Sequence, residues 1–493
     1  MKKLSRKSLL SLLLAACMLA PIVSCAKERV ADETTVSTAL STESVTETEE
    51  IGDGLPDTDM DGYTFSILNF NEEWLTWANT RIVVEEINGD ILNDAYYERQ
   101  AKLEERFHCV LHVDEVRTPV EVIGTNVTAG NTDYDSYFFN EGQMAAVLPY
   151  VLDWNSIPYL ALNDAWWNPN ATSVYEIHGK QIALSGNISL SAVSRSVCMV
   201  FNKNIYTDLS LDDNLYDLVH DNQWTIDRFL SIAEMAGNDV NGDGVFTADD
   251  RYGLNMGRGF KGYITSLLCG AGMNYTTMDT DGVPQFTIMQ NERALSLMEK
   301  LINALGVQGF YYNEDSSPDG FKPADFFSSG HALFTQGVPH DIYKLRDMDD
   351  DIGILPMPKH DETQEQYYAA AWGGAVMVLA KTFDMANAAN AGILLEALSY
   401  MGYYDIVPKY KEVALKTKTA RDNESADMLD IIFNNIYFDF GTNIMLDSVI
   451  APQVMAPLWQ KKDASAIVST FEKTAPKIYS YIEDILISID ENL

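Results

Sequence analysis

Short apolar runs alternate with segments of helical periodicity along most of the chain, and this alternation limits the fold more than any single motif. Residues 64–68, 197–201 and 353–355 are strand-like. Helical spacing follows Thr225 and Asp384, where apolar side chains at i, i+3, i+4 and i+7 share one face. Such alternation indicates the α/β class, and no internal repeat points to a solenoid or propeller. The folded part is long enough for two large lobes.

The start of the chain is typical of a secreted lipoprotein. Basic side chains crowd the first seven residues, and residues 9–23 form an apolar run that is too short for a comfortable membrane span. The run ends at Ser24-Cys25, which matches a bacterial lipobox, so we expect a signal peptide over residues 1–24 and acylation of Cys25. Cys17 is the alternative, but cleavage before it would leave an apolar mature start. Acylation would hold the protein on the outer face of the cell membrane.

The segment after the lipobox predicts a tether. Residues 25–58 are acidic and rich in Thr and Ser, a composition that cannot bury enough apolar surface to fold. The whole chain has a formal net charge of -38 and a pI near 4.3. This charge argues against nucleic acid and an anionic membrane surface as partners, because both require basic patches.

Cysteine usage favours buried free thiols. Apart from Cys17 and Cys25, the chain has Cys109, Cys198 and Cys269, each in an apolar setting and without a close neighbour in sequence. The alternative is one disulfide with one unpaired thiol.

An acidic loop at residues 239–250 predicts a structural calcium site. Its D-x-N-x-D-G spacing matches the EF-hand loop, in which oxygens at alternate positions surround one cation and a glycine allows the sharp turn. The alternative is a metal-free turn rich in Asn and Gly. The expected ligands are Asp239, Asn241, Asp243, the carbonyl of Val245 and Asp250.

Several segments, taken in order, resemble extracellular solute-binding proteins of family 1, the sugar-binding lipoproteins of ABC importers, in their clostridial form. The segments that carry the resemblance are residues 88–99, 165–168, 199–206, 224–227, 326–334, 353–359 and 421–430. The resemblance implies a two-lobed fold of the periplasmic-binding-protein type, with a hinge and a ligand cleft between the lobes. It also implies that the lobes close on a carbohydrate, most simply an oligosaccharide, and deliver it to the permease subunits of an ABC importer. Other members of the family bind other solutes. The expected lobes are residues 59–190 with 352–401, and residues 191–351 with 402–493.

Sugar recognition requires aromatic platforms beside fixed polar side chains, and the sequence offers candidates near expected strand ends. The aromatic candidates could equally pack in a lobe core, and Arg195 could bond sugar hydroxyls or pair with an acid. Trp166 and Trp167, set among polar residues, are expected to form a structural corner. The candidate ligand-binding residues are Trp74, Trp77, Asn140, Glu141, Arg195 and Trp372.

No catalytic residues are predicted, because the sequence has no nucleophile elbow, phosphate-binding loop or zinc-binding His pair. We expect a monomeric binding protein. A surface glycan-binding or sensing lipoprotein without transport is the main alternative. A glycan-acting enzyme is the second alternative. Glycosidases use a pair of facing carboxylates, and the many acidic residues of this sequence do not exclude such a pair.

Overall fold

The computed structural model describes residues 53–71, 79–255, 259–312, 323–342, 345, 347–371, 374–415 and 423–493. These residues all belong to the compact unit Gly52–Leu493. The signal peptide, Cys17, Cys25 and most of the tether lie outside the described residues. Among the residues described, no helix combines the length and the apolar composition needed to cross a membrane.

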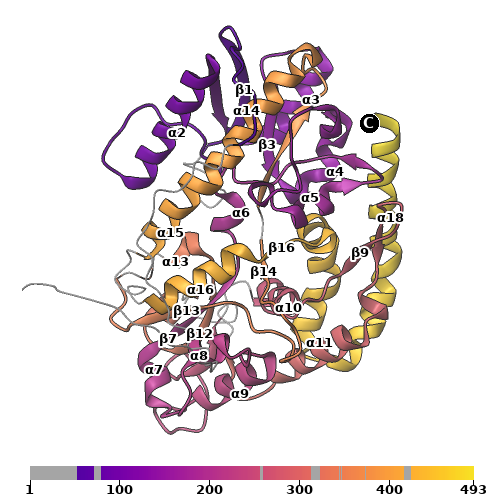
Figure 1. Cartoon of the computed structure of the whole chain (residues 1–493). Helices are drawn as coiled ribbons and strands as arrows, with labels where there is room; N and C mark the ends of the chain where they lie inside the picture. The colour runs from indigo at the N-terminus through magenta and orange to yellow at the C-terminus, as the bar shows by residue number, and fades with distance from the viewer. Residues whose placement is uncertain are drawn as a thin grey trace, which may run out of the picture. The chain divides into compact units, whose positions relative to one another are not determined.

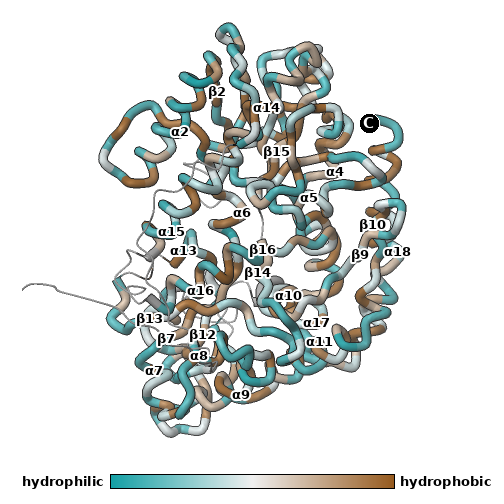
Figure 2. The backbone as a smooth tube through the Cα atoms, in the orientation of Figure 1, coloured by the Kyte–Doolittle hydropathy of each residue, from teal (hydrophilic) through white to brown (hydrophobic). Residues whose placement is uncertain are grey.

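A first mixed sheet is built around β1 (Tyr63–Phe70), most of whose side chains are buried. β1 pairs in parallel with β2 (Cys109–Val116) and β3 (Ser136–Asn140). β15 (Ala375–Ala380), far along the chain, pairs antiparallel with β3 and with the short β4 (Val151–Leu152). All six residues of β15 are buried, and Figure 2 shows the hydrophobic colour along this strand.

Three main helices accompany the first sheet (Figure 1). α2 (Ile91–Phe107) begins where the Asp90 side chain accepts hydrogen bonds from two amides, and it ends at His108 in the left-handed region. α3 (Pro119–Ala129) has proline at its first position, where no amide hydrogen is needed. α14 (Ala388–Met401) is buried along most of its length. A helix follows Asp384, as the sequence predicts, and the Asp384 side chain caps the short turn that leads into it.

A second five-stranded sheet has the order β11-β8-β12-β7-β13. β8 is parallel to β11 and β12, whereas β7 is antiparallel to both β12 and β13. The strands predicted at residues 197–201 and 353–355 are confirmed as β7, which begins one residue later than predicted, and β13. The strand bounds are β7 (Cys198–Asn202), β8 (Tyr252–Asn255), β11 (Tyr311–Tyr312), β12 (Ala332–Gly337) and β13 (Ile352–Leu355).

Helices α9 (Ile226–Ala236), α10 (Gly259–Gly270) and α11 (Glu292–Ala304) belong to the second half of the fold. The helix expected after Thr225 is confirmed as α9, and the Thr225 hydroxyl caps it by accepting the Arg228 amide at 3.3 Å. α9 packs closely on β8: a Cβ on Gly253 would stand 1.9 Å from the Ala233 carbonyl oxygen.

The strand pairing corrects one expected lobe boundary. Residues 352–401 were expected to return to the first lobe, but β13 lies in the second sheet, so the return comes only with β15. The first lobe was also expected to end at residue 401. η9 (Gly402–Ile406) and α15 (Val407–Leu415) nevertheless pack against α2 of the first sheet. Hydrophobic runs identify the strands, but they do not say which sheet each strand joins.

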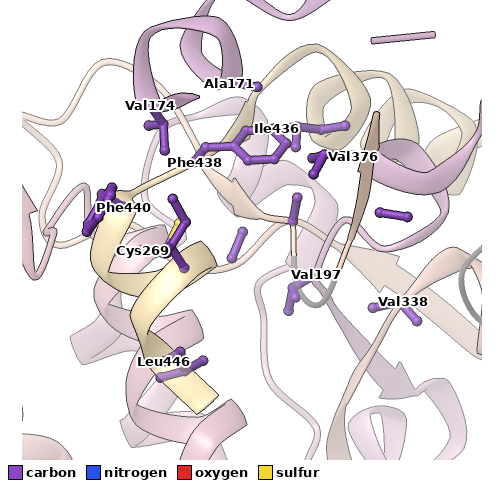
Figure 3. Packing of buried hydrophobic residues seen from close by; sticks show 14 of the residues in the cluster. Ala171, Val174, Val197, Cys269, Val338, Val376, Ile436, Phe438, Phe440 and Leu446 are labelled. Carbon is purple, nitrogen blue, oxygen red and sulfur yellow. The ribbon is translucent and has the colours of Figure 1, made fainter. Parts of the chain in front are cut away.

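Three segments, here named the central segments, lie side by side: residues 195–197, 369–371 and 436–440. β14 (Ala369–Ala370) pairs in parallel with β16 (Ile436–Tyr437). The Val197 amide donates to the Ala370 carbonyl at 2.8 Å. Figure 3 shows Phe438 packed among buried side chains that include Ala171 and Val174. The first two central segments carry the chain between the sheets.

The chain ends in the long helix α18 (Ile467–Asn492), which contacts elements on both sides of the central segments. It packs on α11 and β10 (Pro284–Phe286), and also on α4 (Met144–Val147). Near its end, Asn492 accepts a hydrogen bond from the Lys381 ammonium, which follows β15, at 3.1 Å.

The three cysteines in the described residues, Cys109, Cys198 and Cys269, are buried and free, which confirms the prediction of unpaired thiols. Burial raises the pKa of Cys198 to about 12, so this thiol stays protonated and behaves as a small apolar side chain.

Candidate functional site

In each sheet, a strand ends next to the central segments beside the start of an antiparallel strand. In the first sheet, β3 ends at Asn140 opposite Ala375, where the antiparallel β15 begins. In the second sheet, β12 ends at Gly337 opposite Cys198, where the antiparallel β7 begins. Ligands of α/β sheets bind outside the carboxyl ends of the parallel strands. The candidate site therefore lies where β3 and β12 end.

Glu141, directly after β3, is a buried junction of this site. Its carboxylate accepts hydrogen bonds from the Tyr175 hydroxyl at 2.6 Å, from the Asn443 amide group at 3.0 Å and from the Gly374 backbone amide at 3.0 Å. The side chain is only 2% exposed. Burial outweighs these three hydrogen bonds and raises the pKa of Glu141 to about 7. Glu141 thus joins the end of β3 to the start of β15 and to η10 (Gly441–Met455).

Arg195, at the end of α6 (Ser191–Ser194), is the cation of the site. The residue is partly exposed. Partial burial of the guanidinium lowers the pKa of Arg195, whereas the negative charges of Asp341 and Glu141 act in the opposite direction and raise it. Asp341 lies in α13 (Pro339–Ile342), directly after β12. Tyr410 of α15 also faces Arg195, and burial raises the pKa of its hydroxyl. The structure therefore brings Arg195 and Glu141 together, although they come from separate sequence segments.

The other predicted ligand-binding residues have different outcomes. Asn140 is partly exposed, and its side-chain oxygen accepts the Gly142 amide at 3.0 Å, so this end of the side chain caps a turn. Trp74, Trp77 and Trp372 lie outside the described residues, and their role as sugar platforms stays a prediction.

Trp166 and Trp167 form a structural corner, as predicted. Both indole N–H groups donate to the carboxylate of Glu396 in α14, at 2.8 Å and 2.6 Å, and the Ala161 amide donates to the same carboxylate at 3.0 Å. Trp167 is fully buried.

A pocket of about 350 Å³ lies beside α6. Tyr403 and Phe433 supply aromatic surface, and amide side chains share the lining with them. Pockets that bind small molecules combine apolar walls with a few polar groups in this way. The amide side chains are those of Asn163, Asn168, Asn187 and Asn434.

Sequence reasoning missed four partners of the site. Asp341 lies just after β12, in the same way that Glu141 lies just after β3. Looking for polar residues behind the strand at residues 332–337 would therefore have identified Asp341. Asn443, Tyr175 and Tyr410 carry no such signal. Asn443 stands 302 positions from Glu141, and only the assembled fold brings the two together.

In the acidic loop at residues 239–250, side-chain oxygens are bound to the loop's own amides. Asp239 accepts the Gly242 and Gly244 amides at 2.7 Å, and Asp250 accepts the Val240 and Thr247 amides at 2.9 and 2.7 Å. The Thr247 amide contributes most to lowering the pKa of Asp250. Across the described part of the chain, no three His, Cys, Asp or Glu side chains are grouped to hold a metal ion. The calcium site stays a prediction.

Comparison with solved structures identifies the fold. A cyclo/maltodextrin-binding protein, solved with maltotetraose, is 15% identical with a TM-score of 0.52, over 89% of this chain and 97% of that chain. The ABC substrate-binding protein Lmo0181 from Listeria monocytogenes, solved with cycloalternan, is 12% identical with a TM-score of 0.51, over 86% and 100%. The GacH receptor of Streptomyces glaucescens, solved unliganded and with acarbose, is 12% identical with a TM-score of 0.51, over 85% and 98%.

No family model and no curated protein matches the sequence. The likeness to solved structures is therefore a likeness of fold. The chain has the two-lobed α/β fold of the periplasmic-binding-protein type, as the sequence predicts.

Proposed function

We propose, from this two-lobed binding-protein fold, that the chain is an extracytoplasmic solute-binding protein that captures a neutral carbohydrate and delivers it to an ABC importer. The observation that carries the proposal is the meeting of both sheets' strand ends at Glu141, Arg195 and Asp341. Structures with the same fold hold maltotetraose and cycloalternan. Delivery would use closure of the two lobes about the central segments, a hinge motion that an importer can detect.

The chemistry around Arg195 supports a neutral ligand. The positive charge of the guanidinium is balanced by the nearby carboxylates of Asp341 and Glu141, so the site has no excess positive charge to attract an anion. The net charge of -38 also repels anions at long range. A partly exposed guanidinium can still donate hydrogen bonds to sugar hydroxyls. The aromatic and amide residues of the pocket beside α6 suit the alternating apolar and hydroxylated faces of a sugar.

A thermal-shift screen over oligosaccharides, followed by calorimetry on the hits, tests the proposal. Binding to the folded state alone raises the melting temperature. Arg195→Ala should weaken binding by about 10-fold or more, because a hydrogen bond from a charged group is lost. Arg293→Ala, which removes a well-exposed arginine paired with Asp361, is the control and should bind as wild type does. No shift with any saccharide would contradict the carbohydrate assignment.

The proposed location rests on the lipobox. We propose a lipid anchor on Cys25 followed by a tether through residue 58. Metabolic labelling with a palmitate analogue should mark the wild-type protein and Cys17→Ala, but not Cys25→Ala. Labelling that persists in Cys25→Ala and disappears in Cys17→Ala would move the anchor to Cys17.

Calcium binding in the acidic loop is a further part of the proposal. Its donor types and spacing fit a calcium ion, and Gly244, at the sixth position, has a φ of 82°, the sharp turn that the spacing requires. Calcium at about 100 times its Kd should stabilise the fold by about 2.7 kcal/mol. Melting curves with calcium and with a chelator should differ for the wild type and for Asp281→Ala, an acid of another loop, but not for Asp243→Ala. Equal wild-type curves would rule the site out.

Two experiments separate the alternatives. Thin-layer chromatography of oligosaccharides after incubation with the protein should show no turnover, whereas products would indicate an enzyme. Binding to detergent-solubilised permease subunits in the presence of sugar supports import, whereas failure to bind them would favour a surface glycan-binding or sensing role. Light scattering should report a monomer.

A further inference from the structure

A second pocket, of about 580 Å³, lies apart from Arg195 and Glu141, neither of which lines it. One wall comes from α5 (Pro169–Tyr175) and the turn between β5 (Glu176–Ile177) and β6 (Lys180–Gln181). The opposite wall comes from β9 (Thr276–Met278) and the turn that joins it to β10. In Figure 1, α5 is drawn above β16 and β9 to the right of it. The two turns touch, because the His178 amide donates to the Gly282 carbonyl at 3.0 Å.

The floor of this pocket is rigid. It is formed by residues 437–440 of the central segments, including Asp439, which is buried. The Asp439 carboxylate accepts hydrogen bonds from the amides of Tyr275, Thr276 and Thr442, and from the hydroxyls of both threonines. A carboxylate with five donors fixes the backbone around it. The side chains that rise from this floor therefore have defined positions.

Tyr437 and two asparagines give the pocket the recognition groups of a sugar site. The Tyr437 ring lies 5.0 Å from that of Tyr368, and its hydroxyl accepts the Asn274 amide group at 2.8 Å. The Asn170 side-chain oxygen accepts the Phe438 backbone amide at 2.5 Å. Each amide is thus oriented at one end. In the described residues, the Asn274 oxygen and the Asn170 nitrogen have no protein partner, which leaves one acceptor and one donor group for a ligand.

The charges of the lining select against anions. Among the described residues that line the pocket there is no lysine or arginine, and the acids Glu176, Asp279 and Asp281 are exposed. Asp279 is held by the amides of Asp281 and Val283 and by Gln285, so its oxygens serve the turn. Inside this acidic rim the lining consists largely of amides and hydroxyls beside the Tyr437 ring, which suits a neutral polyhydroxylated molecule.

We propose that this pocket is a second binding site for a neutral saccharide of about two or three sugar units, a size that pockets of this volume accommodate. The proposal shares its ligand class with the proposed function but uses none of the same residues. A bound sugar would contact α5, β9 and the central segments at once.

Native mass spectrometry and calorimetry with maltotriose, cellotriose and raffinose test this proposal. At least one of these sugars should bind wild-type protein with two equivalents. Ser173→Trp, on the exposed side of α5, should fill the pocket and remove one equivalent. Asn274→Ala should weaken the same equivalent by about 10-fold. Ser469→Trp is the matched control, because Ser469 is also exposed and its hydroxyl also donates to the carbonyl three residues earlier.

The two sites fail separately in this design. A wild type that binds one equivalent, lost in Arg195→Ala and kept in Ser173→Trp, overturns the second site and leaves the proposed function standing. One equivalent that is lost in Ser173→Trp and kept in Arg195→Ala supports the pocket and contradicts the strand-end site. Binding of spermidine but of no sugar, or of nothing at all, overturns the second site.

Discussion

At the scale of single residues, Glu141 makes the candidate site sensitive to pH. An unfolded glutamate loses its proton near pH 4.5, whereas burial holds the pKa of Glu141 at about 7. Between these values the folded state binds more protons than the unfolded state, so the contribution of Glu141 to stability falls as pH rises. The total change is roughly 3 kcal/mol, since one pKa unit corresponds to about 1.4 kcal/mol.

Glu141→Gln should remove this pH dependence while keeping the size of the side chain and one acceptor for Tyr175, Asn443 or Gly374. The free energy of unfolding of the variant, relative to wild type, should increase by roughly 3 kcal/mol between about pH 4.5 and pH 8. Urea unfolding of both proteins at several pH values measures this difference. The contributions of the other carboxylates are the same in wild type and variant, so they cancel in it. A constant difference would show that Glu141 ionises normally in the folded state.

Glu396 holds the corner made by Trp166 and Trp167. Glu396→Ala leaves both indole N–H groups and the Ala161 amide without an acceptor, which should cost roughly 3 kcal/mol. Glu396→Gln keeps one acceptor oxygen and should cost less. Glu98→Ala, an exposed glutamate of α2, should change stability by no more than about 0.5 kcal/mol. Chemical denaturation compares the variants, and an equal effect of all three would show that the corner is not held by Glu396.

The sequence allows some of these residues to be predicted and hides others. Glu141 follows a strand, and strand ends bind ligands, so local pattern is enough to select it. Asn443 is invisible to that reasoning, because nothing in its neighbourhood marks it as the partner of a residue 302 positions earlier. The structural role of Trp166 and Trp167 was predictable from the polar residues around them. The identity of Glu396 as the acceptor of their indole N–H groups was not.

At the scale of elements, the contact between α9 and β8 depends on the absence of a side chain. A Cβ on Gly253 would meet the Ala233 oxygen at 1.9 Å, and both atoms belong to rigid backbone. Gly253→Ala should therefore destabilise the fold by about 3 kcal/mol, at the upper end of overpacking effects. In Gly306→Ala the nearest atom stands 3.3 Å away, and the loss should be much smaller. Thermal unfolding of both variants measures the contrast, and similar losses would contradict a tight contact.

The elements themselves follow from sequence more reliably than their pairing does. Thr225 caps α9 because its hydroxyl reaches an amide three residues later, which is a local interaction. The position of β13 beside β7 is not local. β13 pairs with a strand about 150 residues earlier in the chain, and a short buried strand carries no local signal for the sheet it joins. The packing of α15 on α2 has the same origin.

At the scale of the whole molecule, the net charge of -38 opposes compaction. Like charges repel over the Debye length, which falls from about 30 Å to about 10 Å as ionic strength rises from about 0.01 to 0.1 M. The melting temperature should therefore rise by about 2 °C or more over this range. Calorimetry in sodium chloride with a chelator present measures the effect of screening alone. A fall in melting temperature would show that ion pairs, rather than repulsion, dominate.

The interleaved strand order also determines when the chain can fold. The first sheet contains β1, near residue 70, and β15, which ends at Ala380, so its core cannot close until some three hundred further residues have been made. At about 5–20 residues per second, the wait is roughly 15 to 60 seconds. β1, β2 and β3 can pair once residue 140 has been made, but the first sheet stays incomplete until β15 joins β3, which leaves a period for export before this lobe is fully folded.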